Sequence, residues 1–131
     1  MLNASWIFLG GGIGSLARWG LASLVANQTS STFPWGTLVV NVTGSFLIGF
    51  FAGSTGPQGK WPAPTYVHHF LLTGICGGYT TFSAFSLQTY SLMEAGAPGK
   101  ALLNCVLSVG LCLAAVSLGH MVAALFKPAH I

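Results

Sequence analysis

The stretch that decides the fold reads Gly74-Ile75-Cys76-Gly77-Gly78-Tyr79-Thr80-Thr81-Phe82-Ser83-Ala84-Phe85-Ser86. It lies inside the third of four long apolar segments, where a helix that crosses a bilayer is expected. Two adjacent glycines followed by two threonines, however, are poor helix formers. The sequence therefore predicts that the third membrane helix is broken at Gly77-Gly78, near the middle of the membrane.

A break at that depth indicates a functional site. Irregular backbone is tolerated inside a bilayer only where it is buried in protein or lines a wet cavity, because an unpaired amide or carbonyl is costly in hydrocarbon. In the half-helix that follows the break, Phe82 and Phe85 are three residues apart and share a face, with Ser83 and Ser86 on a neighbouring face. Aligned rings, hydroxyls and freed carbonyls favour an ion path over ordinary core packing.

The composition is that of an integral membrane protein. Of 131 residues, 53% are apolar and only 4% are charged. A single acidic residue, Glu94, excludes mechanisms that need paired carboxylates, such as glycoside hydrolysis or a multi-acid proton relay. The four cations are scattered and form no nucleic-acid footprint. The three cysteines fit small buried side chains, and the histidine spacing does not favour a metal site. We therefore predict neither an enzyme nor a nucleic-acid-binding protein.

We predict one all-α domain that crosses the membrane four times. The predicted spans cover residues 6–26, 35–53, 66–93 and 101–126. The third is longer than a straight crossing requires, as expected if part of it is not helical. The short turn at 94–99 makes the last two spans antiparallel neighbours.

The first span carries a small-residue stripe and a charge. Gly10 and Gly14 are four residues apart, a spacing that lets another helix approach closely. A charge as deep as Arg18 normally faces protein or water. We favour a structural role for Arg18, which either extends toward the nearer interface or caps carbonyls of another helix.

The second and fourth spans each carry a polar line at four-residue spacing. In the second span Asn41 is the central member, and its amide needs partners either across a helix interface or with water and ions in a pore. Both roles remain open from the sequence. In the fourth span the line comprises Asn104, Ser108 and Cys112, and alone it is more typical of helix–helix hydrogen bonding than of a conduction path.

The positive charges give almost no orientation signal. Lys60 and Lys127 fall on the side of the N-terminus, whereas Lys100 and Arg18 fall on the other side or nearer to it. Without a bias the chain can insert both ways. Two oppositely inserted copies could then pair their glycine faces, which comprise Gly10, Gly14, Gly49 and Gly53.

Three motifs carry a family resemblance over nearly the whole chain. They are Gly11-Gly12-Ile13-Gly14-Ser15-Leu16-Ala17-Arg18, then Gly36-Thr37-Leu38-Val39-Val40-Asn41 with Gly44 and Gly49, and the stretch 74–86 quoted above. Together they resemble the Fluc/CrcB family of small fluoride channels. The resemblance implies an antiparallel, dual-topology homodimer in the inner (plasma) membrane, with two fluoride pores at the subunit interface and passive efflux of cytoplasmic fluoride.

The resemblance also assigns roles to residues. It implies a structural sodium ion on the dimer axis, held by the main-chain carbonyls of Gly77 and Thr80 from both copies. Phe82 and Phe85 would form an aromatic box beside the fluoride path, with Asn41 reaching in from the second span. A ring edge suits an anion because it is the positive end of the ring's quadrupole.

Further members of the predicted path are donors or departures from the family pattern. The donors are the hydroxyls of Thr81, Ser83 and Ser108. The departures are Gln88, where the family usually has glutamate, Asn104, where tyrosine is common, and Cys112, where serine is common. All three lie toward one end of the path, so its centre is intact and its exit route is open to question.

An alternative function is a small dual-topology exporter of organic cations, which would share this size, span count and charge balance. Such an exporter needs a membrane-embedded carboxylate to exchange protons for its cargo. The only acid, Glu94, comes at the end of the third span. The sequence therefore favours the channel.

Overall fold

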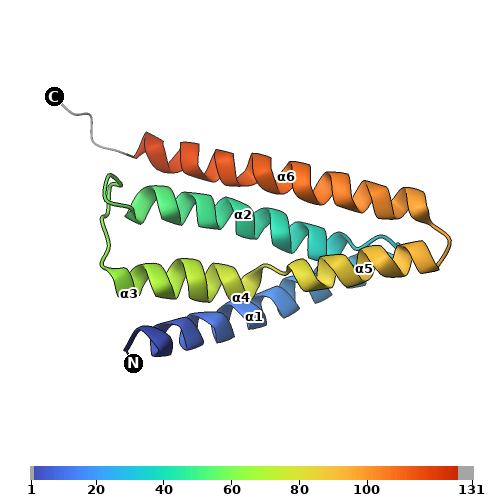
Figure 1. The fold of residues 1–131 in the computed structure, drawn as a ribbon, viewed down its shortest axis with the longest axis horizontal. Coiled ribbons are helices and arrows are strands. Elements are labelled where there is room, and N and C mark those ends of the chain that lie inside the picture. The colour runs from blue at the N-terminus through green and yellow to red at the C-terminus, as the bar shows by residue number, and fades with distance from the viewer. Residues whose placement is uncertain (1, 127–131) are drawn as a thin grey trace.

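The structure, a computed structural model, describes residues 2–126. Four helical segments are long and apolar enough to cross a membrane, at Asn3–Gln28, Trp35–Thr55, Thr65–Glu94 and Pro98–Leu125, and consecutive segments run in opposite directions (Figure 1). The first, second and fourth are the continuous helices α1 (Leu2–Gln28), α2 (Trp35–Thr55) and α6 (Pro98–Leu125). The four predicted spans are confirmed as helices, with ends that differ by a few residues.

The two ends of the bundle carry the connections in the predicted pattern. The N-terminus, the loop between α2 and α3, and the end of α6 lie at one end, and the other two connections lie at the opposite end (Figure 1). There Lys100 Nζ donates a hydrogen bond of 2.7 Å to Thr32 Oγ1 and ties these two connections together. Lys60 and Lys100 thus lie at opposite ends, as predicted, whereas Lys127 falls outside the described residues.

The third span is broken, but not where the sequence predicted. It comprises α3 (Thr65–His68), the π-helical segment η1 (His69–Cys76), α4 (Gly77–Tyr79) and α5 (Phe82–Glu94). Gly77 is helical, with φ −65° and ψ −37°. The chain becomes extended at Thr80 (φ −78°, ψ 159°) and Thr81 (φ −152°, ψ 112°). The break at Gly77-Gly78 was therefore placed about one helical turn too early.

Close packing explains why the glycine pair is helical. A Cβ atom at Gly78 would lie 2.5 Å from the carbonyl oxygen of Gly11 in α1. Gly78 therefore serves a close backbone approach between α1 and the third span, not the interruption of the helix. The two threonines, whose β-branched side chains suit extended backbone, form the break instead.

The glycine faces that we expected to pair two copies are covered by the chain itself. A Cβ at Gly10 would lie 2.5 Å from the Phe70 carbonyl oxygen, and one at Gly14 would overlap the carbonyl of Ile75 in η1. Across the bundle, a Cβ at Gly49 would overlap the Val116 carbonyl of α6, and one at Gly53 would lie 2.8 Å from Ala123 Cβ. The expectation that these four glycines pair two copies is wrong, because spacing reveals a close-packing face but not which helix covers it.

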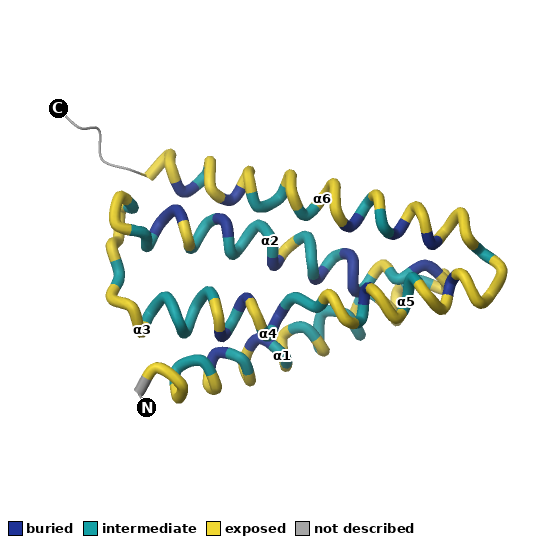
Figure 2. Tube along the Cα trace, in the orientation of Figure 1, coloured by how far each residue is buried: buried dark blue, intermediate teal, exposed yellow. Residues whose placement is uncertain are grey.

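These approaches sort the helices into packed pairs. α1 packs on η1 and α4, while α2 packs on α6, and α1 also contacts α2. Buried residues gather on the sides that face these neighbours, and the outward sides are exposed (Figure 2). Many of the exposed residues are large and apolar, including Phe8, Leu16 and Leu113. Such an outer surface suits the hydrocarbon of a bilayer.

We predict that Gly14→Ala destabilises the fold, because the added methyl would meet the Ile75 carbonyl and lie 2.8 Å from the Tyr79 nitrogen. Overpacking of this kind costs about 1–3 kcal/mol. Thermal unfolding in detergent measures it. The matched control is Gly20→Ala in the same helix, where a Cβ meets nothing within 4 Å. Equal melting temperatures for the two variants would contradict the packing described here.

Candidate functional site

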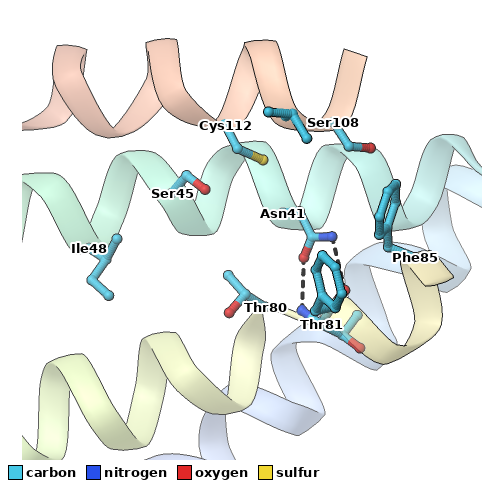
Figure 3. Close-up of a pocket in the computed structure, with 10 residues that line it drawn as sticks. Asn41, Ser45, Ile48, Thr80, Thr81, Phe85, Ser108 and Cys112 are labelled. Atoms are coloured by element: carbon cyan, nitrogen blue, oxygen red, sulfur yellow. Dashed lines mark hydrogen bonds between the residues drawn. The ribbon is translucent and has the colours of Figure 1, made fainter. Parts of the chain in front are cut away.

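The break is held in place by the side-chain amide of Asn41 in α2. Asn41 Nδ2 donates to the Thr81 carbonyl at 3.1 Å, and the Thr81 amide donates to Asn41 Oδ1 at 2.8 Å (Figure 3). One side chain thus satisfies both backbone groups of an extended residue inside a membrane span. Of the two roles left open for Asn41, the structure shows the helix-interface role. One amide hydrogen of Asn41 is not used in this pair.

The break leaves backbone carbonyls without their helical donors, among them those of Gly77 and Thr80. In a continuous helix the Thr81 amide would bond to the Gly77 carbonyl, and the Ala84 amide would bond to the Thr80 carbonyl. Here the Thr81 amide donates to Asn41, and the Ala84 amide donates to Thr81 Oγ1 at 3.2 Å, which caps α5. Gly77 and Thr80 therefore each lose the helical donor of their carbonyl.

These are the two carbonyls that the family resemblance assigns to sodium. Hard cations bind oxygen ligands, and a carbonyl released from a helix is such a ligand. The residues present therefore fit a small cation. The second copy would have to supply the remaining oxygens, since one chain offers too few for a closed shell.

Helix α1 supplies donors to the same region. Arg18, which is half-buried, donates from Nη1 to the Thr80 carbonyl at 3.4 Å, and Ser15 Oγ donates to the Gly78 carbonyl at 3.4 Å. Arg18 thus has the carbonyl-capping geometry that was one of the two structural roles predicted for it. Both bonds are long, so the carbonyls keep capacity for a further partner.

A cavity of about 300 Å³ adjoins the break. It lies among α2, the break, α5 and α6 (Figure 3). It is lined by Asn41, Ser45, Ile48, Thr80, Thr81, Phe82, Phe85, Ser108, Val109 and Cys112. None of these residues is charged. Six of the nine residues predicted for the ion path meet here: Asn41, Thr81, Phe82, Phe85, Ser108 and Cys112.

The two phenylalanines are in contact but differ in exposure. Their ring centroids lie 5.3 Å apart with an angle of 48° between the planes. Phe85 is 9% exposed and is held by the chain's own packing, whereas Phe82 is 78% exposed. One wall of the cavity is therefore anchored in this chain, and the other stands at its surface.

Comparison with known proteins assigns this architecture to a family. The model described as "CrcB-like protein, Camphor Resistance (CrcB)" matches residues 5–120. The chain belongs to the CrcB family. This confirms the resemblance found in the sequence and covers the four membrane spans nearly end to end.

Curated relatives of the CrcB-family chain bear one name. The chain is 54% identical to the "Fluoride-specific ion channel FluC" of Opitutus terrae, over 90% of this chain and 89% of that protein. It is 50% identical to the protein of the same name from Methylocella silvestris, over 90% of each chain. The match to the Rhodospirillum rubrum protein of that name is 48% over 93% of this chain and 95% of the relative.

Three residues predicted for the path lie outside the cavity of this CrcB-family chain. Ser83 Oγ lies 3.2 Å from Thr81 Oγ1, at the exposed start of α5. Asn104 is buried and donates to Thr89 Oγ1 at 2.9 Å, while its Oδ1 accepts from Ser108 Oγ at 3.4 Å. The N-terminal part of the polar line in α6 therefore joins α6 to α5. This is the helix–helix role that the line alone favoured in the sequence.

Gln88 lies in a separate recess of about 340 Å³ that also includes Arg18 and Thr37. Its Oε1 atom is buried and has no hydrogen-bond partner within the described part of the chain. The recess also includes Thr81, which lines the main cavity as well. Gln88 therefore shares a recess with Thr81 of the break but does not share the cavity that holds the rings of Phe82 and Phe85.

The sequence reasoning missed two residues of this region. Ser45 lines the cavity, and its position four residues after Asn41 on the polar face of the second span was a usable signal. Tyr79, the last residue of α4, is buried and hydrogen-bonds to Thr43. No spacing rule links two residues so far apart in the sequence.

We predict that Asn41→Ala destabilises the break, because it removes both hydrogen bonds to Thr81. An unsatisfied buried polar group costs about 1–3 kcal/mol. Thermal unfolding in detergent should therefore show a clear loss of stability. Ser45→Ala is the matched control, since Ser45 lines the same cavity one helical turn away in α2. Equal melting temperatures for both variants would mean that Asn41 does not hold the break.

Proposed function

We propose that the chain is a fluoride-specific ion channel of the cell's inner membrane that lets cytoplasmic fluoride leave passively. The observation that carries the proposal is the uncharged cavity at the break, where Asn41, Thr81, Phe82, Phe85 and Ser108 come together. Relatives that are 54% and 50% identical over 90% of the chain bear the name of such a channel, which supports it.

The lining chemistry suits a small, strongly hydrated anion. A pore must replace the ion's water by donors and still release the ion. The free amide hydrogen of Asn41 and the hydroxyl of Thr81 are available as donors, and Ser108 could donate if it turned from Asn104 Oδ1. The ring edges of Phe82 and Phe85 attract an anion weakly and add no full charge. Arg18 lies in the neighbouring recess and does not line this cavity, so no cation there binds fluoride tightly enough to trap it.

The exporter of organic cations gains no support. Glu94 is exposed at the last residue of α5 and does not line the cavity at the break. A proton-coupled exporter needs its carboxylate inside the membrane, where cargo and proton compete for it.

The working unit that we propose is an antiparallel homodimer with two pores at its interface. Support comes from the balanced charges and from Phe82, which is 78% exposed although it lines the cavity. A second copy would cover this ring and close the open wall. Between the copies, the carbonyls of Gly77 and Thr80 would hold a structural sodium ion, which would offset the cost of burying freed carbonyls.

We predict that Phe82→Ile and Phe85→Ile each strongly reduce fluoride efflux from liposomes that contain the purified protein. The substitutions keep apolar bulk, so the dimer should still assemble, but the positive ring edge is lost. Chloride efflux should be negligible in the wild type and in every variant. Phe8→Ile is the matched control, because Phe8 is 80% exposed and Phe82 78%. Fluoride efflux near the wild-type rate in the Phe82/Phe85 double variant would mean that the two rings serve only as core packing.

We predict that replacing sodium by a large organic cation slows or stops fluoride efflux at an unchanged fluoride gradient. A structural ion that neutralises freed carbonyls is needed for the pore's shape and is not consumed with each transport event. An undiminished flux after thorough exchange would show that the carbonyls of Gly77 and Thr80 hold no sodium.

We predict that the protein inserts in both orientations. In a variant without Cys76, Cys105 and Cys112, a single Gln58→Cys lies at one end of the bundle and a single Ala95→Cys at the other. An impermeant thiol reagent applied to intact cells should label comparable fractions of both variants. Adding two lysines beside Lys60 should bias insertion and lower activity. Labelling of only one of the two positions would rule out dual topology.

A further inference from the structure

The turn that precedes the break is packed between two helices that have no side chain at the contact. On the α1 side, a Cβ at Gly14 would lie 2.8 Å from the Tyr79 nitrogen. On the α2 side, a Cβ at Gly44 would lie 2.9 Å from Tyr79 Cδ1 and would overlap Thr80 Cγ2. The glycines let both helices approach, but they offer no directional bond. Directional bonds to this turn must therefore come from side chains elsewhere on α1 and α2.

The Tyr79 side chain adds a short directional bond to α2, beside the longer bonds that Ser15 and Arg18 of α1 make to the Gly78 and Thr80 carbonyls. Tyr79 Oη lies 2.8 Å from Thr43 Oγ1 in α2. Thr43 Oγ1 itself donates to the Val39 carbonyl at 2.8 Å and lies 3.2 Å from the Val40 carbonyl. Its one hydroxyl proton is thus used within α2. The arrangement that uses both hydroxyl protons has Tyr79 as the donor and Thr43 as the acceptor of the bond that joins α4 to α2.

The bond lies next to the freed carbonyls. Tyr79 is between Gly77 and Thr80, and its ring is 9% exposed, so its hydroxyl cannot turn to bulk water without moving the turn. A rotation of α4 would redirect the Gly77 carbonyl and the start of the extended segment together. The bond is also well removed from the cavity, since neither Tyr79 nor Thr43 lines it.

We propose that Tyr79 is a positioning residue for the cation site: its hydrogen bond to Thr43 sets the direction of the Gly77 and Thr80 carbonyls and thereby the affinity for sodium. The inference rests on the proposed function, in which these carbonyls hold sodium. It assigns to Tyr79 and Thr43 no contact with fluoride.

The test is the rise in melting temperature with sodium concentration, measured on the detergent-solubilised protein in a background of large organic cation. A ligand that binds only the folded state stabilises it by RT ln(1 + [L]/Kd), so the melting temperature begins to rise once the ligand concentration approaches Kd. Tyr79→Phe keeps the ring and removes the hydroxyl. A typical hydrogen bond corresponds to about a two- to tenfold change in an equilibrium constant. We expect Tyr79→Phe to raise the sodium Kd fitted from this dependence by that factor.

Variants of the partner make the test specific. Thr43→Val should give the same shift, and the double variant should shift no further than either alone, because both remove one bond. Thr43→Ser keeps the acceptor, and Tyr90→Phe removes the hydroxyl of an exposed tyrosine on α5, so both should leave the sodium dependence unchanged. Fluoride efflux from liposomes should recover toward the wild-type rate in Tyr79→Phe at saturating sodium.

The possible outcomes distinguish failure of this inference from failure of the proposals on which it rests. A sodium-dependent wild type with an unshifted Tyr79→Phe and Thr43→Val overturns the role of Tyr79 alone. A loss of stability that is the same at every sodium concentration also overturns it, because such a loss reflects packing and not sodium binding. Failure of both variants to fold overturns it as well. A wild type that conducts fluoride without any response to sodium overturns the sodium site as well. Absence of fluoride efflux in the wild type overturns the channel itself.

Discussion

The pair of hydrogen bonds between the Asn41 amide and the backbone of Thr81 is the interaction on which the rest of the structure depends. An interrupted helix inside a bilayer leaves amides and carbonyls without water to satisfy them. Asn41 satisfies both backbone groups of Thr81, and Thr81 in turn caps α5 through its side chain. Once these bonds form, the Gly77 and Thr80 carbonyls have lost their helical donors, and Phe82 and Phe85 begin a new helix that faces α6.

Small residues make this arrangement possible. Glycines in α1, α2 and the third span bring backbones together so closely that a methyl group at Gly14 or Gly44 would collide. The close approach places Arg18 near the Thr80 carbonyl and Asn41 near Thr81. Polar groups of two helices thus converge on one extended dipeptide, while the outward surfaces stay apolar. A site of this kind needs few polar residues, which agrees with a chain in which only 4% of residues are charged.

The sequence predicted the four spans and a broken third helix from apolar length and local propensity, and six residues that share one cavity from spacing together with the family resemblance. It placed the break too early, since poor helix propensity does not distinguish a glycine that ends a helix from one that admits a neighbour, and Gly78 does the latter. It also assigned the Gly10, Gly14, Gly49 and Gly53 faces to a second copy, although the chain covers them itself. The bond between Tyr79 and Thr43 depends on tertiary packing, which local sequence does not encode.

The central claim is that the cavity at the break conducts fluoride and excludes larger halides. The most direct measurement is ion release from liposomes that hold the purified wild-type protein, followed with fluoride- and chloride-selective electrodes in sodium-containing buffer. The account predicts rapid passive release of fluoride, driven by its gradient alone, with chloride retained. No fluoride release above that of protein-free liposomes, or chloride release at a comparable rate, would contradict it.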